Sequence, residues 1–439
     1  MNNRLRVAWF SSLSGGSVSN FVTRLLLEPL SKEIDLTIFH NGERGAFQTS
    51  SGEIPIFHYL KAVERDERQP FDLFFYHLED RKECDFMRIH LALKPGVVWF
   101  HDLFLSNHGP EPILNSSWSE IVERFSDLKR AWPKHDREYT SAGVLAEREA
   151  GMSFLPLFSN PRDHSEYNRL IKRRLCGDDA KSLLLRHPVP QALFERKNGR
   201  RAGDALNIAL SALPRVESQV HHFFEALTQS TFSGTVHWPV PAVEISRAEE
   251  LVSEFELRER CQIIAGEGPQ AWENVLANVD VGVHLRFSAF GQPSPYLPMT
   301  LAAGLPALVT DFAAGAAYPA NAVFKISPGQ AQVAEIALVL QQIQALSAEV
   351  FRENSRSYAR EFSTSEVVSR QFLDIFAAEL PRLSLFSKRW RAVEHSARQE
   401  LIRESKTLGV QDAKFMSENY RTLVDPIFTE LGWSAGESQ

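Results

Sequence analysis

The sequence of 439 residues is 44% hydrophobic and 23% charged, which is typical of a folded globular chain and excludes a disordered one. Its 48 basic and 55 acidic side chains give a net charge of −7, so a basic face for nucleic acid is not expected. The three cysteines lie far apart, which excludes a disulfide framework or a zinc-ligand spacing and favours a reducing, cytoplasmic compartment. No apolar run approaches the ~20 residues of a membrane-spanning helix.

The first half of the chain alternates short apolar runs with runs of helical period. Residues 5–10 predict a buried strand. Apolar residues between Val18 and Leu26 then recur at i, i+3, i+4, i+7 and i+8, which predicts a helix that Pro29 ends. Further strands are expected at residues 34–39, 71–76 and 97–101. This alternation predicts a parallel sheet that binds ligands at the carboxyl ends of its strands.

A second strand–helix alternation follows a polar, turn-rich linker predicted at residues 197–204. Its strands are expected at residues 206–210, 236–238, 262–265, 281–285 and 305–310. Its helices are expected at residues 221–227, 271–279, 296–303, 331–346 and 348–361. We therefore predict an α/β fold with two Rossmann-like parallel-sheet domains facing a cleft. The predicted units are residues 1–200, residues 201–385 and a helical C-terminal extension, 386–439.

Five residues lie where such a fold places its ligands. Gly15 and Gly16 precede the first helix, so backbone N–H groups can approach an anion at the positive helix end. Arg286 follows an apolar strand, and its guanidinium can bind two oxygens of a diphosphate. Ser294 can cap the next helix and direct its first N–H groups into the cleft. His101 ends a strand at the same sheet edge, where we expect it to face the ligand.

The segment at residues 280–319 resembles the donor-site segment of family 4 glycosyltransferases, which have the GT-B fold. The resemblance is carried by Leu285-Arg286, Gly291, Ser294, Ala302-Ala303-Gly304 and Pro306. Scattered matches extend it from residue 5 to residue 376, among them Gly15-Gly16, the run VWFHD at 98–102 and His187-Pro188-Val189. The resemblance implies transfer of a sugar, with retained configuration, from a nucleoside diphosphate sugar to a hydroxyl acceptor, in polysaccharide or glycoconjugate synthesis.

The resemblance also implies which residues form the site. His101 and Gln292 are expected beside the donor sugar as catalytic residues. The expected donor- and phosphate-binding residues are Gly15, Gly16, Arg215, Arg286, Gly291 and Ser294. No metal ion and no cofactor are expected, because helix N-termini and arginines can carry the phosphate charge.

The chain departs from the family pattern at charged positions. Gln292 and Met299 stand where the family has two glutamates, which contact the donor sugar and the ribose hydroxyls. Ser218 or Gln219 stands where the family has a phosphate-binding lysine, with Arg215 as a nearby substitute. Two further functions therefore stay open. One is a catalytically inactive, transferase-like subunit that binds a glycan, nucleotide or protein partner. The other is a sugar-nucleotide epimerase, although the acidic and histidine cluster that its chemistry needs is missing.

The expected partners are a nucleotide sugar and an acceptor that is a glycan, a lipid-linked glycan or a protein. The C-terminal extension offers a further surface, because basic residues flank Phe386 and Trp390 and can contact an anionic membrane or a protein. Acidic residues are interleaved with them, which favours a solvated helix instead. No nucleic-acid partner is expected.

Overall fold

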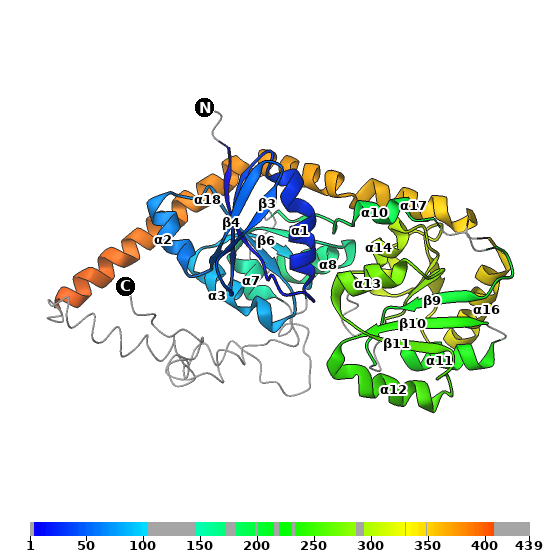
Figure 1. Ribbon diagram of the computed structural model, residues 1–439. Helices are drawn as coiled ribbons and strands as arrows, with labels where there is room; N and C mark the ends of the chain where they lie inside the picture. Colours follow the sequence, from blue (N-terminus) through cyan, green and yellow to red (C-terminus); the bar gives the residue numbers. More distant parts are fainter. Residues whose placement is uncertain are drawn as a thin grey trace.

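The structure is a computed structural model that describes residues 4–103, 146–172, 181–197, 201–214, 219–230, 233–286, 294–329, 331–347 and 349–407. Two sheet domains lie side by side, and a long helix, α18 (Ser365–Thr407), returns from the second domain across the first (Figure 1). The predicted fold class is confirmed, with two Rossmann-like domains and a helical C-terminal segment.

The first domain is built on an eight-stranded sheet of order β3-β4-β2-β1-β5-β6-β7-β8. Only the β3–β4 pair is antiparallel within this described sheet. The strands are β1 (Arg6–Phe10), β2 (Asp35–His40), β3 (Gly45–Thr49), β4 (Gly52–His58), β5 (Leu73–Leu78), β6 (Gly96–Phe100), β7 (Ser153–Phe158) and β8 (Leu183–Leu184). Strands β1, β5 and β6 are almost wholly apolar, because helices cover both faces of the sheet.

Two hydrophobic clusters fill the two faces of this sheet. One face packs against α1 (Val18–Leu30) and α18, and the other against α2 (Lys61–Arg68), α3 (Asp85–Leu93) and α7 (Glu147–Met152). Helix α8 (Pro161–Glu166) follows β7 and begins at its cap residue Asn160. Aromatic rings dominate the centre, where Trp9 stacks on Phe75 with ring centroids 4.5 Å apart.

The second domain has a six-stranded parallel sheet of order β11-β10-β9-β12-β13-β14. Its strands are β9 (Leu206–Leu210), β10 (Gly234–Val240), β11 (Cys261–Ala265), β12 (Val281–His284), β13 (Ala307–Thr310) and β14 (Phe324–Ile326). One face packs against α11 (Val220–Gln229), α12 (Ile245–Glu254) and α16 (Gln332–Ala345). The other packs against α10 (Gln191–Glu195), α13 (Gly268–Leu276), α14 (Leu297–Ala302) and α17 (Glu349–Ser363), while the short α15 (Ala313–Ala316) follows β13.

The observed elements differ from the predicted ones where local pattern and tertiary packing disagree. Helix α1 continues through Pro29 to Leu30, because a proline in the last turn removes only one backbone hydrogen bond just before the helix ends. The hairpin β3–β4 was not predicted, since β3 is a largely exposed edge strand without apolar alternation. Strand β7 was also missed, because Pro156 lies inside it.

The chain crosses between the domains twice, and the two crossings lie side by side. The first follows β8, and the second joins α17 to α18. The Val189 N–H donates to the Ser363 carbonyl at 2.8 Å, and Val189 forms an isolated parallel bridge with Thr364. The predicted boundaries at residues 200 and 385 stay predictions. The structure packs Val368, Phe372 and Phe376 of α18 into the core of the first domain, although the sequence grouped them with the second.

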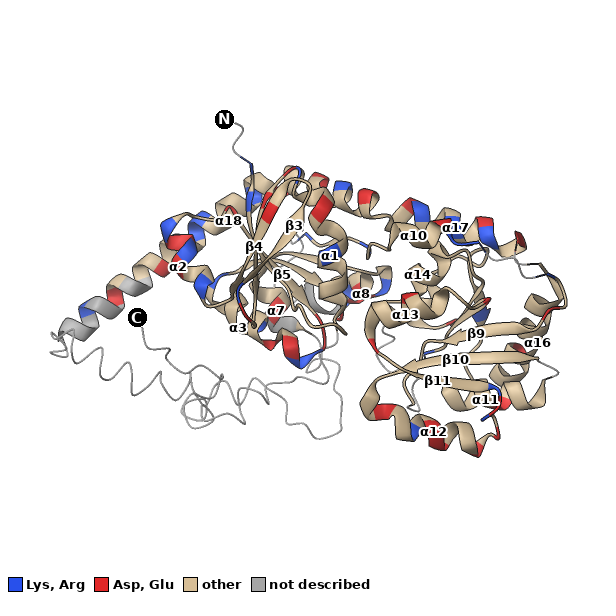
Figure 2. Ribbon diagram, viewed as in Figure 1, with Lys and Arg blue, Asp and Glu red and all other residues tan. Residues whose placement is uncertain are grey.

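Along α18, acidic and basic side chains are interspersed, whereas the strands of both sheets carry few charges (Figure 2). Its C-terminal part is tied to the first domain by Arg391, which bonds to Asp66, and by an ion pair of 2.8 Å between Glu394 and Lys94. Among the described helices, none alone combines the length and apolar composition of a membrane span. Only α16 and α17 taken together, as a pair bent by 109°, meet that criterion.

We expect Phe372→Ala to destabilise the first domain by about 3–5 kcal/mol, because it opens a cavity among Trp9, Phe75 and Phe376. Urea unfolding followed by tryptophan fluorescence measures this change. The matched control on the same helix is Leu385→Ala, whose side chain is 47% exposed and should change stability by less than about 0.5 kcal/mol. Equal effects of the two substitutions would show that α18 is not part of this core.

Candidate functional site

A cavity of about 260 Å³ lies between the two domains, at the carboxyl ends of both sheets. The first domain contributes residues that follow β5, β6 and β7, and the second contributes residues that follow β9 and β12. The first crossover adds Arg186 and His187, and α17 adds Tyr358. Parallel strands place such residues together, because the chain leaves each strand at the same sheet edge.

The N-terminus of α1 at this cavity is occupied by a carboxylate of the protein itself. Glu79, which follows β5 and is 4% exposed, accepts the Ser19 N–H at 2.6 Å and the Val18 N–H at 3.0 Å. It also accepts the Ser17 hydroxyl at 2.6 Å. These donors at the positive helix end are therefore satisfied internally, as a helix N-terminus requires. Gly16 lines the cavity, and the predicted phosphate-binding role of Gly15 and Gly16 stays a prediction.

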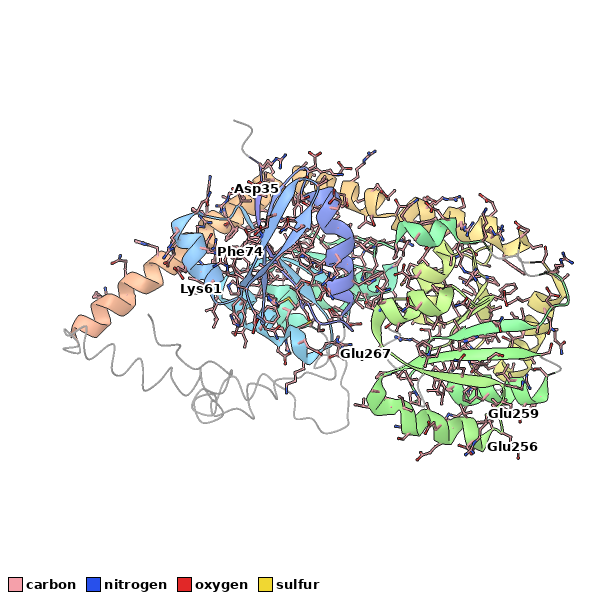
Figure 3. All side chains as sticks on the ribbon, in the orientation of Figure 1. Asp35, Lys61, Phe74, Glu256, Glu259 and Glu267 are labelled. Carbon is pink, nitrogen blue, oxygen red and sulfur yellow. The ribbon has the colours of Figure 1, made fainter. Side chains whose placement is uncertain are left out.

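Gly16 also lies at a close approach of the two domains. A Cβ atom on Gly16 would lie 2.7 Å from Glu267 Oε1, and one on Gly268 would lie 2.8 Å from Gly16 Cα. Arg81 reaches across from the first domain to Glu267 at 3.8 Å. Figure 3 labels Glu267 at the edge of the second domain that faces the first. The glycines thus permit close interdomain contact in addition to any contact with a ligand.

Two aspartates of the first domain lie beside the cavity, Asp163 fully buried and Asp102 partly buried. Asp102 lines it and accepts the Asp80 N–H at 3.0 Å. Burial raises the pKa of Asp102 to about 7, with neighbouring Glu79 and Asp80 adding to the effect. A carboxyl group with a pKa near 7 can exchange a proton at neutral pH. Asn160 caps α8 by accepting the Asp163 N–H at 2.9 Å, and burial raises the pKa of Asp163 to about 6.

His101 lies at the end of β6 but both of its ring nitrogens are engaged. Nε2 lies 2.8 Å from His77 Nδ1, and Nδ1 lies 2.7 Å from His187 Nε2. The side chain is 3% exposed, and burial lowers its pKa to about 3, so the ring is neutral at pH 7. In this arrangement neither nitrogen is directed at a ligand, and the predicted catalytic role of His101 stays a prediction.

Arg286 follows β12 by two residues and lines the cavity from the second domain. Its backbone N–H donates to Thr310 Oγ1 at 3.0 Å, and that hydroxyl donates to Gln219 Oε1 at 3.0 Å. Gln219 and Gln332 form a reciprocal pair of amide hydrogen bonds of 2.8 and 3.1 Å. A buried amide network therefore fixes the end of β12. Gln219, one of the two positions at which the resemblance implies a phosphate-binding lysine, belongs to this framework.

Ser294 and Met299 are directed into the second domain. The Ser294 hydroxyl lies 2.9 Å from His284 Nδ1, whose other nitrogen lies 2.9 Å from Thr300 Oγ1. Ser294 also accepts the Tyr296 N–H at 3.4 Å, so it does bond to the segment that starts α14. Met299 is 1% exposed in the core, which explains how an apolar residue is tolerated there.

Three of the predicted site residues, Arg215, Gly291 and Gln292, lie outside the described residues. Of the eight predicted site residues, the structure brings four to the cavity wall: Gly16, His101, Arg286 and Ser294.

Several residues of the cavity wall were not predicted as site residues: Glu79, Asp80, Arg81, Asp102, Arg186, His187, Tyr296, Tyr318 and Tyr358. Glu79 to Arg81 directly follow the apolar strand β5, so their place at a strand end was a usable signal. Arg186 packs its guanidinium 4.3 Å from the Phe362 ring centre and donates to the Tyr358 hydroxyl. That contact joins segments more than 170 residues apart, and no local pattern indicates it.

Within the described residues, no group of three or more histidine, cysteine, aspartate or glutamate side chains has an arrangement that could hold a metal ion. The ring nitrogens of the three neighbouring histidines bond to one another and do not converge on a common point. Arginines 81, 186 and 286 are the described cationic groups of the cavity wall, and they suit an anionic ligand.

No protein-family model matches the sequence, and a search of curated proteins finds no match. Solved structures do match. Sucrose-phosphate synthase from Thermosynechococcus elongatus has a TM-score of 0.61 at 11% identity, over 86% of this chain and 100% of that one. A glycosyltransferase from Rickettsia africae has a TM-score of 0.57 at 11% identity, over 86% and 99%. HepE from Anabaena, in complex with UDP-glucose, has a TM-score of 0.56 at 12% identity, over 85% and 99%. The likeness shows that this chain has the GT-B fold.

Several histidines of the folded protein have a lowered pKa, from which we predict that mild acid destabilises the protein. Burial lowers the pKa of six of them: His58, His77, His90, His101, His187 and His284. Below pH 6.5 the unfolded chain binds protons that the folded protein excludes. As the pH falls, each fully buried histidine therefore lowers the free energy of unfolding by about 1.4 kcal/mol per pH unit, until the pH reaches the pKa of that histidine in the folded protein, near 3 for His90.

Asp102 and Asp163 have the opposite effect on the free energy of unfolding between pH 7 and 4, because the folded protein binds their protons at a higher pH than the unfolded chain does. These two aspartates are outnumbered by the six histidines. We expect the melting temperature to be lower at pH 5.5 than at pH 7.5. His90→Gln should reduce this difference, and the exposed His395→Gln should not. An equal or higher melting temperature at pH 5.5 in the unsubstituted protein would contradict the neutral state of these rings.

Proposed function

We propose that this chain is a cytoplasmic glycosyltransferase of the family 4 type, which transfers a sugar from a nucleoside diphosphate sugar to a hydroxyl acceptor without a bound metal. The reaction takes place in the interdomain cavity. The GT-B fold supports the proposal, as do the structures of HepE in complex with UDP and with UDP-glucose, which have the same fold. The expected retention of configuration and a role in polysaccharide or glycoconjugate synthesis belong to this proposal.

The position of Arg286 on the cavity wall is the observation that best supports the proposal. Arg286 is the charged residue that the described part of the second domain contributes to the cavity wall. Burial lowers its pKa, and Tyr296 and Asp102 act against that change, so the guanidinium keeps its charge at neutral pH. A planar cation in a partly desolvated cleft suits a diphosphate, whose oxygens it can bind in pairs.

The chemistry follows from the same position. When the bond between the anomeric carbon and the diphosphate breaks, negative charge develops on the departing diphosphate. A guanidinium that is already held in place by its strand stabilises that charge without reorganisation. Arg81 and Arg186 line the same cavity and add positive potential. The acceptor hydroxyl then forms the new glycosidic bond to the anomeric carbon, and its proton passes to an oxygen of the departing diphosphate.

A second candidate is a transferase-like subunit that binds the same ligand without turnover. Met299, where the family has a glutamate, and Gln219, one of the two positions expected to match the family lysine, serve the framework here. Met299 is buried in the core, and Gln219 is held by Gln332 and Thr310. A protein that uses these positions for packing has fewer groups for ribose and phosphate, which favours binding without catalysis.

We expect Arg286→Ala to weaken UDP binding by roughly tenfold or more, since a charge-assisted hydrogen bond contributes about 1.5–3 kcal/mol. Arg286→Lys should be intermediate, because a lysine keeps the charge and loses the paired geometry. Isothermal titration with UDP and with UDP-glucose measures both. The control is Arg258→Ala, an exposed arginine of the second domain, which should bind as the unsubstituted protein does.

The contrary outcome is equally measurable. If Arg286→Ala lowers the melting temperature of the free protein while the folded variant keeps its affinity for UDP, then Arg286 holds the structure together and does not bind the ligand.

Gln292→Glu restores the residue that the family has at this position and separates the two candidates. We expect binding of UDP-glucose to be kept, because the two side chains have nearly the same shape, and release of UDP from UDP-glucose to increase. A coupled assay for UDP measures this release with and without an acceptor. If both proteins bind UDP-glucose and neither releases UDP, the non-catalytic candidate is the better one. Loss of binding in Gln292→Glu would contradict the correspondence between Gln292 and the family glutamate.

A further inference from the structure

Three histidines form a continuous row from the interior of the first sheet to the cavity. His77 lies in β5, His101 follows β6, and His187 lies on the first crossover. Their hydrogen bonds measure 2.8 Å between His77 and His101 and 2.7 Å between His101 and His187. The first two rings stack with centroids 5.1 Å apart, and the last two lie 4.8 Å apart.

The row has one buried end and one open end. His77 is 0% exposed between Trp9 and Trp99, and its Nε2 has no hydrogen-bond partner among the described residues. His187 is partly exposed and lines the cavity. Its Nε2 bonds to His101. Some nitrogens of the described residues are buried without a hydrogen-bond partner, and Nδ1 of His187 is not one of them. Nδ1 is thus the atom of the row that a ligand in the cavity can reach.

The burial of His77 determines which ring nitrogen of each histidine carries the proton. Burial lowers the pKa of all three histidines, so each neutral ring carries one proton. If the protons lay on Nε2, His77 would bury an N–H without an acceptor, which folded proteins strongly avoid. If they lie on Nδ1, His77 donates to His101, His101 donates to His187, and the Nδ1–H of His187 is directed to the cavity.

We propose that His187 donates a hydrogen bond from Nδ1 to an oxygen of the ligand in the cavity, and that His77 and His101 are positioning residues that set its tautomer. The proposal rests on the proposed function, since the ligand oxygen belongs to a phosphate or to a sugar hydroxyl of a nucleotide sugar. His101 acts only through His187, because both of its nitrogens are engaged in the row.

The tautomers can be observed directly, without a ligand, by NMR of protein labelled with ¹⁵N in its 14 histidines. Single substitutions of the row assign the signals. We expect His77, His101 and His187 each to be neutral and protonated on Nδ1. A proton on Nε2 of His187, or a charged ring in the row at pH 7, would overturn the proposal.

The ligand contact is tested by a matched pair at one position. An asparagine places its amide nitrogen where the imidazole has Nδ1, and a glutamine places it where the imidazole has Nε2. We expect His187→Gln to weaken UDP-glucose binding about five- to tenfold and His187→Asn to stay within about twofold of the unsubstituted protein. If UDP binding falls equally, the oxygen belongs to a phosphate. If only UDP-glucose binding falls, it belongs to the sugar.

The positioning role is tested at the far end of the row, where His77 does not line the cavity. His77→Phe removes the donor to His101, so we expect the proton of His187 to move to Nε2 and UDP-glucose binding to weaken several-fold. His77→Asn keeps a donor at the position of Nδ1 and should restore both. A His187 that stays protonated on Nδ1 in His77→Phe would reduce His77 to a packing residue and overturn that half of the proposal.

The outcomes separate this inference from the proposed function. Unsubstituted protein that binds both probes and is insensitive to His187→Gln overturns the inference alone. Unsubstituted protein that binds no nucleoside diphosphate and no nucleoside diphosphate sugar overturns the proposed function, and with it the ligand contact of His187.

Discussion

The carboxyl ends of two parallel sheets open onto one cleft, and the composition of the site follows from this constraint. Residues that leave neighbouring strands at the same edge come together whatever their distance in sequence. Glu79 follows β5, Asp102 follows β6 and Arg286 follows β12, and all three line one cavity. The first domain therefore supplies carboxylates together with Arg81, and the second supplies Arg286, so groups of both charges meet in the cleft.

Most of the carboxylates are already satisfied by the protein. Glu79 accepts three donors at the start of α1, and Asp102 accepts a backbone N–H from Asp80. Such bonds hold the residues that the first domain contributes to the cavity in one geometry before any ligand binds. A preorganised site of this kind avoids the free-energy cost of rearrangement. In the second domain, the amide network around Gln219 does the same for the strand that carries Arg286.

The two crossovers connect this geometry to the relative position of the domains. Val189 bonds to Ser363, and two residues earlier His187 ends the row of histidines that begins inside the first sheet. Arg186 joins the same segment to Tyr358 and Phe362 of α17. The first crossover is therefore held from both sides, and a ligand that contacts His187 contacts the segment about which the domains are joined.

The sequence by itself determined the α/β class, the two-domain organisation and most strands of the second domain, because apolar runs and their period report local burial. It also indicated Arg286 and His101 at strand ends. Only the tertiary structure decided that the Glu79 carboxylate accepts the first N–H groups of α1, that Met299 belongs to the core, and that α18 packs on the first domain. It alone joined His77 to His101 and His187, residues separated by 24 and 86 positions. The physical reason is that these side chains meet through strand order and chain crossings, which depend on long-range packing and leave no periodic trace in the sequence.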